Sequence, residues 1–382
     1  MTFLNKIQKY FNKDVSFIEI IVIMLCVILV IMVLGWIWSK LSLKDRNCDT
    51  LNKLYNVPPV GLVSIDPSQK LYCHPLRDFY VKSAYNCCAT GNYKSDFVSI
   101  CALKDCIKQG ARCLDFEIYS LDNEPVIAVS DVSNYNTKGS FNALPFSDAL
   151  ETIENYAFTS SHAPNNKDPL FIHLRIMSNN KIIYEKMAKN IYDSIENRIL
   201  GKQYSYEYNG NNLGKESLKN FMEKIIIIVD KNNALFEKTA LDEYVNIASN
   251  TPHMRCIRYN QVKDTPSMSD LIDFNSKNMT ICIPNLGITP INPSPMVAMQ
   301  YGCQFVAMAF QNFDTNMEYY SMFFQESGSA FVLRPAELRF TPQTYPKPKP
   351  QDPKLGFGNK CFNKMSKITG EEGCNSTHTA SI

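Results

Sequence analysis

The hydrophobic positions of this 382-residue chain form one long uninterrupted run and a series of shorter ones. The long run, Ile20 to Trp38, contains no charged side chain. At about 1.5 Å per residue it is long enough to cross a hydrocarbon layer roughly 30 Å thick. Trp36 and Trp38 close the run where an interfacial aromatic belt belongs. We therefore expect a transmembrane helix over residues 17–39, after a polar N-terminal segment over residues 1–16. A cleaved signal peptide is the alternative, but the run is too long and no small-x-small cleavage site follows it.

The shorter runs alternate between strand-like and helix-like patterns. Short runs rich in β-branched and aromatic residues predict strands at residues 79–84, 112–119, 125–130, 170–176, 224–230, 254–259, 279–284 and 303–310. Helical patterns lie between most of them, at residues 97–109, 146–157, 181–200, 214–222, 234–248 and 267–276. In the second of these helices we expect Ser147 as the N-cap and Glu151 in the first turn. The third should end at Gly201, because glycine commonly follows a helix.

This order of elements predicts the α/β class. Nearly continuous apolar strands separated by helices indicate a parallel sheet that is covered on both faces. Eight such strands within residues 70–341 predict a (β/α)8 TIM barrel. An open doubly wound sheet is the alternative, but no glycine-rich phosphate turn follows the first strand. We expect a linker over residues 40–69 and a disordered tail, rich in proline and lysine, over residues 342–382.

Charge gives little information on partners or on orientation. The net charge is +2 and the lysines and arginines are dispersed, so nucleic acid is not an expected partner. Basic residues lie on both sides of the long apolar run, at Lys6, Lys9 and Lys13 before it and at Lys40, Lys44, Arg46 and Lys53 after it. The positive-inside rule therefore barely discriminates between the two orientations of a single-pass protein.

The 13 cysteines do not form a metal or disulfide pattern in the sequence. There is no C-x-x-C pair, no zinc spacing and no short disulfide framework. Several cysteines, Cys101 among them, fall in periodic apolar segments, where a free thiol behaves as a small hydrophobic group. Two sequons, at Asn278 and Asn375, would matter only on a lumenal face. These observations favour the cytosolic side for the barrel.

Two carboxylates, Asp115 and Glu117, stand inside the second predicted strand, A-R-C-L-D-F-E-I-Y at 111–119. Carboxylates in such places are paired, metal-bound or catalytic. Residues two apart on a strand share a face, so Asp115 and Glu117 point the same way, as do His173 and Arg175 on a later strand. Because the chemistry of a barrel lies at the carboxyl ends of its strands, these residues could converge there.

Seven segments of the chain resemble, in order and spacing, the eukaryotic phosphoinositide-specific phospholipase C family. P-L-R-D-F-Y-V-K-S-A-Y-N at 75–86, C-I-K-Q-G-A-R-C-L-D-F-E at 106–117, E-P-V-I at 124–127, F-S-D-A-L-E-T-I-E-N-Y-A-F at 146–158 and D-P-L-F-I-H-L at 168–174 are similar to its X region. Y-G-C-Q-F-V-A-M-A-F-Q at 301–311 and G-S-A-F-V-L-R-P at 328–335 are similar to the end of its Y region. The resemblance covers roughly residues 70 to 340 and implies a barrel of the phospholipase C type.

The resemblance also implies an active site, and most of its motifs fail here. The family cleaves inositol lipids with two histidines and one Ca²⁺ ion. The histidine positions fall on Tyr85 and Val129. Of the calcium ligands, the asparagine is kept as Asn86 and both strand-two acids are kept as Asp115 and Glu117. The last acid falls on Arg175.

The positions that grip the substrate are also changed. Of two phosphate-gripping lysines in the family, one matches Lys231 and the other falls near Val229. The arginine and tyrosine that grip the inositol phosphates map near Ile288 and Pro293. Because a guanidinium cannot shed its proton, Arg175 puts a fixed cation where the ion would sit, and we expect it to pair with Asp115 and Glu117 instead.

Three hypotheses follow from these changes. The first is a membrane-anchored phospholipase C-like pseudoenzyme that holds no metal, contacts the bilayer through residues 17–39 and acts as a binding or structural module for an unknown protein partner. The second is an active or altered phosphoric diester hydrolase acting on phospholipid, with Ca²⁺, in which His173, Tyr85 or Lys231 has a new role. The third is a receptor that grips a phosphoinositide or another anionic headgroup with Arg175 and Lys231 without cleaving it.

Overall fold

The computed structural model describes residues 17–342. Its central feature is a ring of eight parallel strands, each joined to the next in the order β7, β6, β5, β2, β1, β10, β9, β8. Their bounds are β1 Phe79–Ala84, β2 Cys113–Leu121, β5 Leu170–Ile176, β6 Ile225–Asp230, β7 Ile247–Ser249, β8 Met254–Arg258, β9 Met279–Ile283 and β10 Phe305–Met308. Among the described residues no ladder joins β7 to β8, so the barrel is nearly closed at that point. The TIM-barrel prediction is confirmed.

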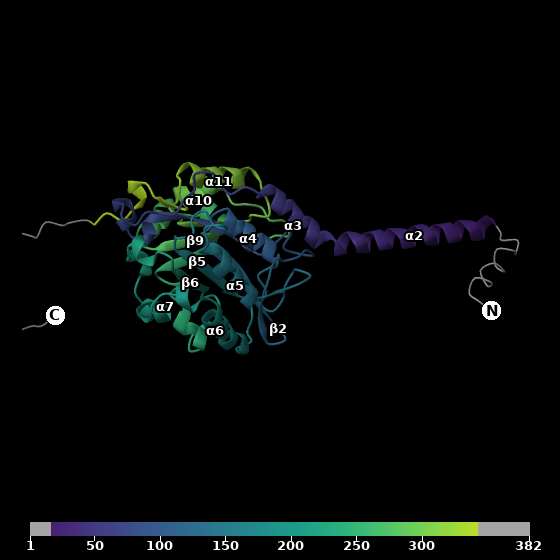
Figure 1. Cartoon of the computed structure of the whole chain (residues 1–382), viewed down its shortest axis with the longest axis horizontal. Helices are drawn as coiled ribbons and strands as arrows, with labels where there is room; N and C mark the ends of the chain where they lie inside the picture. Colours follow the sequence, from purple (N-terminus) through teal and green to yellow (C-terminus); the bar gives the residue numbers. More distant parts are fainter. Residues whose placement is uncertain (1–16, 343–382) are drawn as a thin grey trace, which may run out of the picture. The chain divides into compact units, whose positions relative to one another are not determined.

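Helices cover the outside of this ring, as Figure 1 shows for the strands β5, β6 and β9 and the helices around them. Their bounds are α4 Ile100–Lys108, α5 Phe146–Ala157, α6 Ile182–Ile195, α7 Ser205–Asn209, α8 Tyr259–Lys263, α9 Met268–Lys277, α10 Pro295–Gln300 and α11 Thr315–Glu326. All residues of β1, β5 and β6 are buried, as expected for strands covered on both faces. Inside the barrel, the rings of Phe171 and Phe305 pack edge to face at 5.1 Å.

Three strands lie outside the ring. β3 (Glu124–Ala128) pairs antiparallel with β2, β4 (Leu144–Pro145) pairs with β3, and β11 (Phe331–Leu333) pairs antiparallel with β1. The sequence analysis counted residues 125–130 as the third barrel strand, and this was wrong. Only Asp122 and Asn123 separate β2 from β3, and both have positive φ, at 51° and 63°. Two such residues form a hairpin turn, whereas a parallel neighbour needs a crossover of about a dozen residues.

The expected helix at 234–248 was also wrong. This segment forms two 3-10 helices, Ala234–Phe236 and Ala240–Tyr244, followed by β7, which completes the eight strands. Residues 214–222 likewise form 3-10 turns, at Leu213–Lys215 and Leu218–Phe221. The helix expected at 181–200 is α6, which ends at Ile195, well before Gly201. Helix α5 begins after Pro145 with Asp148 in its first turn, and the Ser147 hydroxyl donates to the Asp148 carboxylate, so Ser147 is not the N-cap.

The N-terminal part of the described chain contains two helices, α2 (Phe17–Leu41) and α3 (Leu43–Leu54). α2, purple in Figure 1, is long and apolar enough to cross a membrane, by length and composition alone. α3 lies inside the segment expected to be a linker, so that segment is partly helical. The expected disordered tail falls, apart from residue 342, outside the described residues.

Candidate functional site

The polar cluster expected from the sequence lies inside the barrel, on neighbouring strands. β2 and β5 run parallel in a register that sets Asp115 opposite His173 and Glu117 opposite Arg175. Because side chains two residues apart share a face, all four point to the same side of the sheet. Asp115 is 1% exposed and Glu117 is 3% exposed, so both carboxylates depend on neighbouring donors for their solvation.

Arg175 supplies most of these donors. Its Nε donates to Asp115 Oδ1 at 2.9 Å, and one Nη2 hydrogen bond reaches Asp115 Oδ2 at 2.7 Å. Its Nη1 donates to Glu117 Oε1 at 2.6 Å. Nη2 also donates to the side-chain oxygen of Asn86 at 2.8 Å. The ion pairs expected between Arg175 and the two acids are therefore present in the structure, and the guanidinium grips Asp115 with two parallel bonds.

Other residues complete the network around the carboxylates. Asn86 has a positive φ of 44°, which asparagine tolerates, and its backbone N–H donates to Asp115 Oδ2 at 3.1 Å. His173 Nδ1 lies 2.7 Å from Asp115 Oδ1. The Tyr119 hydroxyl donates to Glu117 Oε2 at 3.0 Å. Each of the four carboxylate oxygens thus has at least one partner.

Electrostatics keeps Asp115 and Arg175 ionised. Although burial acts to raise the pKa of Asp115, the charge of Arg175 and the hydrogen bond with His173 hold it well below its usual range. Although burial acts to lower the pKa of Arg175, the charges of Asp115 and Glu117 raise it well above its usual value. Burial and the charge of Glu117 raise the pKa of Tyr119, so its hydroxyl keeps the proton that it donates to Glu117.

The oxygens of this cluster do not fit a Ca²⁺ ion. Such a site needs about six to eight oxygen ligands with their lone pairs free. Here all four carboxylate oxygens and the Asn86 side-chain oxygen accept hydrogen bonds, most of them from Arg175. An ion at this place would meet the fixed positive charge of the guanidinium. Within residues 17–342, no group of three or more His, Cys, Asp or Glu side chains is arranged to hold a metal.

The two positions at which the resemblance places histidines are both buried. The guanidinium carbon of Arg175 lies 4.6 Å from the centre of the Tyr85 ring, which is the distance of a cation–π contact. The Tyr85 ring also packs edge to face on Tyr93 at 5.7 Å. Burial raises the pKa of Tyr85 to about 12. Val129 follows β3 and belongs to the apolar core.

His173 and Lys231, the two other candidate functional residues, each contact carboxylate groups in the structure. His173 is 0% exposed, and its Nε2 has no hydrogen-bond partner among the described residues. Lys231 follows β6, and its ammonium contacts Glu207 at 3.0 Å and Glu237 at 2.7 Å. Although partial burial acts to lower the pKa of Lys231, the hydrogen bonds to these glutamates raise it. Lys231 lines a cavity of about 280 Å³ with Glu207 and His253, and Arg175 does not line that cavity.

The two rim positions, Ile288 and Pro293, are those at which the resemblance places the arginine and tyrosine that grip the inositol phosphates, and both carry apolar side chains. Ile288 and Pro293 line a cavity of about 390 Å³ in the loop after β9. Ile288 is exposed, and no cation of the described chain lines this cavity. Val229 is fully buried within β6. The structure therefore does not bring Lys231, Arg175 and the rim positions together into one cationic pocket.

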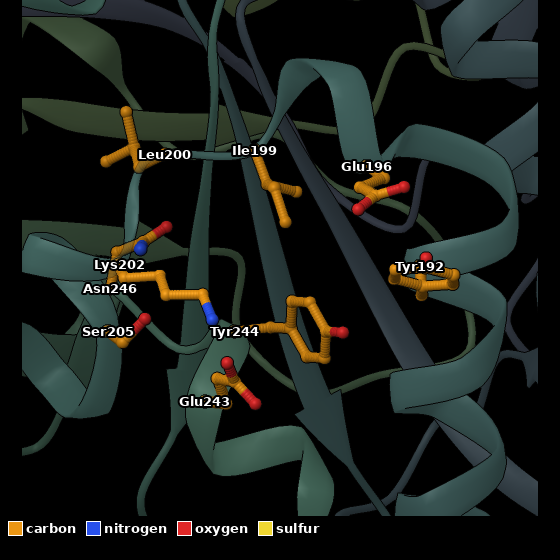
Figure 2. A pocket seen from close by; sticks show the side chains of 9 residues that line it. All are labelled: Tyr192, Glu196, Ile199, Leu200, Lys202, Ser205, Glu243, Tyr244 and Asn246. Carbon is orange, nitrogen blue, oxygen red and sulfur yellow. The ribbon is translucent and has the colours of Figure 1, made fainter.

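A further cavity, of about 180 Å³, lies at the other end of the strands (Figure 2). Its lining residues are Tyr192, Glu196, Ile199, Leu200, Lys202, Ser205, Glu243, Tyr244 and Asn246. Ile199 is bridged to the first residue of β6, and Asn246 immediately precedes β7, so the cavity lies at the amino ends of these strands. In a TIM barrel this end serves stability and the opposite end serves chemistry.

Sequence reasoning missed one member of the cluster, Tyr119, and one contact within it. Tyr119 shares the face of Asp115 and Glu117 through the period-two pattern of β2, and that pattern was a signal for it. The ring contact between Tyr85 and Arg175 had no such signal, because it depends on where the residue that follows β1 lies relative to the end of β5. The assignment of Asn86, Asp115, Glu117 and Arg175 to a former calcium site remains a prediction.

Comparisons with known proteins agree on one family. Residues 72–231 match the X domain of phosphatidylinositol-specific phospholipase C, and residues 230–337 match its Y domain. The protein 1-phosphatidylinositol 4,5-bisphosphate phosphodiesterase 1 of Saccharomyces cerevisiae is 24% identical over 135 residues, which are 34% of this chain and 14% of the yeast protein.

Solved structures show the same fold. The crystal structure of L. pealei PLC21 has a TM-score of 0.58 and 19% identity, over 72% of this chain and 39% of that one. The crystal structure of S. officinalis PLC21 has a TM-score of 0.57 and 19% identity, over 73% of this chain and 39% of that one. The chain thus spans much less than half the length of these relatives, and at this level of identity the likeness establishes the barrel fold.

Proposed function

Because the chain belongs to the phosphatidylinositol-specific phospholipase C family, we propose that it is a membrane-anchored, catalytically inactive member that serves as a binding or structural module. The main support is the position of Arg175, whose guanidinium is hydrogen-bonded to both strand-two carboxylates. A metal that polarises a phosphate needs those oxygens as ligands. An ion pair between buried partners replaces the metal in this proposal.

The residues at the family's histidine positions support the same conclusion. Proton transfer near neutral pH needs a group whose pKa lies near the working pH. Burial raises the pKa of Tyr85 to about 12, and Val129 has no titratable side chain. Loss of each proton-transfer group costs about 10²- to 10⁴-fold in rate, so the loss of two of them and of the metal leaves little activity.

The two other hypotheses have weaker support. For an altered hydrolase, the favourable observation is the contact between His173 and Asp115, with the second ring nitrogen of His173 unpartnered among the described residues. However, His173 is fully buried, so a phospholipid has no access to it. For a headgroup receptor, Arg175 and Lys231 are the expected cations, and each already contacts two carboxylates.

Membrane anchoring is the second part of the proposal. α2 has 25 residues with an apolar composition and no buried side chain, which suits a helix surrounded by lipid. The proposal predicts that the protein stays in the membrane pellet after extraction with alkaline carbonate. The sequence-based expectation of a cytosolic barrel stays a prediction, and the disulfide considered below argues for the opposite side.

A hydrolysis assay tests the proposed inactivity. The full-length protein is incubated with vesicles containing phosphatidylinositol or its phosphates, with and without Ca²⁺, and the yeast relative provides the positive control. We expect no release of inositol phosphate under either condition. Calcium-stimulated release would overturn the proposal in favour of the hydrolase. Saturable headgroup binding without release, lost in Lys231→Ala, would identify the headgroup receptor instead.

A further inference from the structure

Helix α3, which directly follows the membrane-spanning candidate, is fixed to the barrel by a disulfide. Cys48 in α3 is bonded to Cys101 in α4, with 5.9 Å between their Cα atoms, which is a usual spacing for a disulfide. Polar contacts support the same docking. The Asn47 side-chain amide donates to Asp96 at 3.0 Å, and the Tyr55 hydroxyl donates to the backbone oxygen of Phe310 at 2.7 Å. α3 is therefore docked on the barrel, against α4. The expectation that Cys101 is a free thiol was wrong.

Most of the remaining cysteines of the barrel are buried free thiols. Six free thiols are fully enclosed, at Cys87, Cys88, Cys106, Cys113, Cys282 and Cys303. Burial raises the pKa of the Cys113 and Cys282 thiols well above the usual value and that of Cys303 to about 12. The thiolate is the reactive form, so these enclosed thiols persist in a reducing or an oxidising compartment and do not distinguish the two.

The Cys48–Cys101 pair does distinguish them. Both cysteines are only half-buried, so they lie within reach of reductants in the surrounding solution. Glutathione and thioredoxin keep accessible cysteines reduced in the cytosol, whereas disulfides form and persist in the secretory pathway and outside the cell. The basic residues on the two sides of α2 are almost balanced and do not oppose either orientation.

We propose that the barrel lies on the non-cytosolic side of the membrane, where the Cys48–Cys101 disulfide locks α3 onto α4, and that residues 1–16 face the cytosol. This inference rests on the anchoring part of the proposed function, because α2 must span the membrane for the two ends to differ in side. It also limits the partners of the module to lumenal or extracellular molecules.

The first test measures the disulfide in the full-length protein. Cells are lysed in SDS with a maleimide that blocks every free thiol, and the protein is then reduced and labelled with a maleimide of about 5 kDa, which shifts the gel band once per newly released thiol. We expect two more labels on the wild type than on the variant Cys48→Ser/Cys101→Ser. The variant Cys73→Ser removes an exposed free cysteine and should keep the wild-type pattern. Equal labelling of the wild type and the double variant would overturn the inference.

The second test measures the side of the membrane. The chain carries one epitope tag at each end, and sealed microsomes are treated with protease with and without detergent. We expect the N-terminal tag to be digested in both cases and the C-terminal tag only with detergent. Digestion of the C-terminal tag in sealed vesicles would overturn the inference, while carbonate extraction separately reports whether anchoring fails. The tag result does not depend on folding of the cysteine variants.

Discussion

Replacing Arg175 with methionine should destabilise the barrel by about 3–5 kcal/mol, because it removes one partner of a buried ion pair. Arg175 donates four hydrogen bonds of 2.6 to 2.9 Å, three of them to carboxylate oxygens. Without the guanidinium, Asp115 and Glu117 stay buried beside the weaker neutral donors Asn86 and Tyr119. Methionine keeps much of the side-chain volume, so the loss measures charge pairing more than a cavity.

The measurement is thermal unfolding of the full-length protein in detergent, followed with a thiol-reactive dye. Both tryptophans lie in α2, so tryptophan fluorescence does not report on the barrel. The six enclosed thiols of the barrel do report on it, because they react only when it opens. For a domain of this size, the expected loss lowers the midpoint by roughly 5–10 °C.

Two variants control this experiment. Arg258→Met removes a half-buried arginine that donates one hydrogen bond, to the backbone oxygen of Pro284 at 2.9 Å, and should shift the midpoint by no more than about 2 °C. The triple variant Arg175→Met/Asp115→Asn/Glu117→Gln removes all three charges together and should recover much of the loss. A loss below about 1 kcal/mol in Arg175→Met, or a wild-type midpoint that rises with added Ca²⁺, would refute the reasoning.

Two further predictions follow from the same cluster and from the disulfide. Because Arg175 and His173 hold the pKa of Asp115 below its unfolded value, Asp115 contributes stability above about pH 4 and loses it as the pH falls further. In urea unfolding below pH 4, Asp115→Asn should lower the slope of stability against pH by up to about 1.4 kcal/mol per pH unit, and an unchanged slope would contradict the depressed pKa. Loss of the Cys48–Cys101 bond, which links residues 53 apart, should lower stability by up to about 4 kcal/mol, and unfolding of Cys48→Ser/Cys101→Ser against Cys73→Ser measures it.

The barrel could be predicted from the sequence although one of its strands was assigned to the wrong segment. The antiparallel β3 was counted as a barrel strand and the three-residue β7 was missed, so the total of eight remained correct. The short turn at Asp122 and Asn123 was a readable signal, since it leaves no room for a crossover. β7 gave no comparable signal, because three residues are too few to show a period and its place in the sheet depends on pairing with β6.

The N-terminal helices and the disulfide show where the sequence pattern is insufficient. α3 has few apolar positions, and only Leu51 among them is buried, so its segment resembled a linker. Its docking depends on contacts with residues that are distant in the sequence, such as Asp96, Cys101 and Phe310. By contrast, α11 was missed although its signal was present, because Asp314 accepts a hydrogen bond from the Met317 N–H as a regular N-cap.

The candidate site was more predictable than the elements around it, and the reason is physical. Two carboxylates on one face of a covered strand require positive charge nearby, and the neighbouring strand offers His173 and Arg175 in matching register. Register follows from the apolar pattern of the two strands, so the ion pair could be expected from the sequence alone. Two contacts could not be predicted from the sequence. They are the contact of His173 Nδ1 with Asp115 and the contact of the Tyr85 ring with Arg175.

The altered site and the proposed side of the membrane support each other. Anionic phosphoinositides belong to the cytoplasmic leaflet. A barrel held on the opposite side by α2 and α3 does not meet them, so residues able to bind Ca²⁺, transfer protons or grip inositol phosphates would have no substrate there. Arg175 then stabilises the fold through its ion pairs with the carboxylates that a catalytic ion would need as ligands. Lys231 is held in the same way by ion pairs with Glu207 and Glu237. If the tags instead place the barrel in the cytosol, this connection is lost, and the inactivity would rest on Arg175, Tyr85 and Val129 alone.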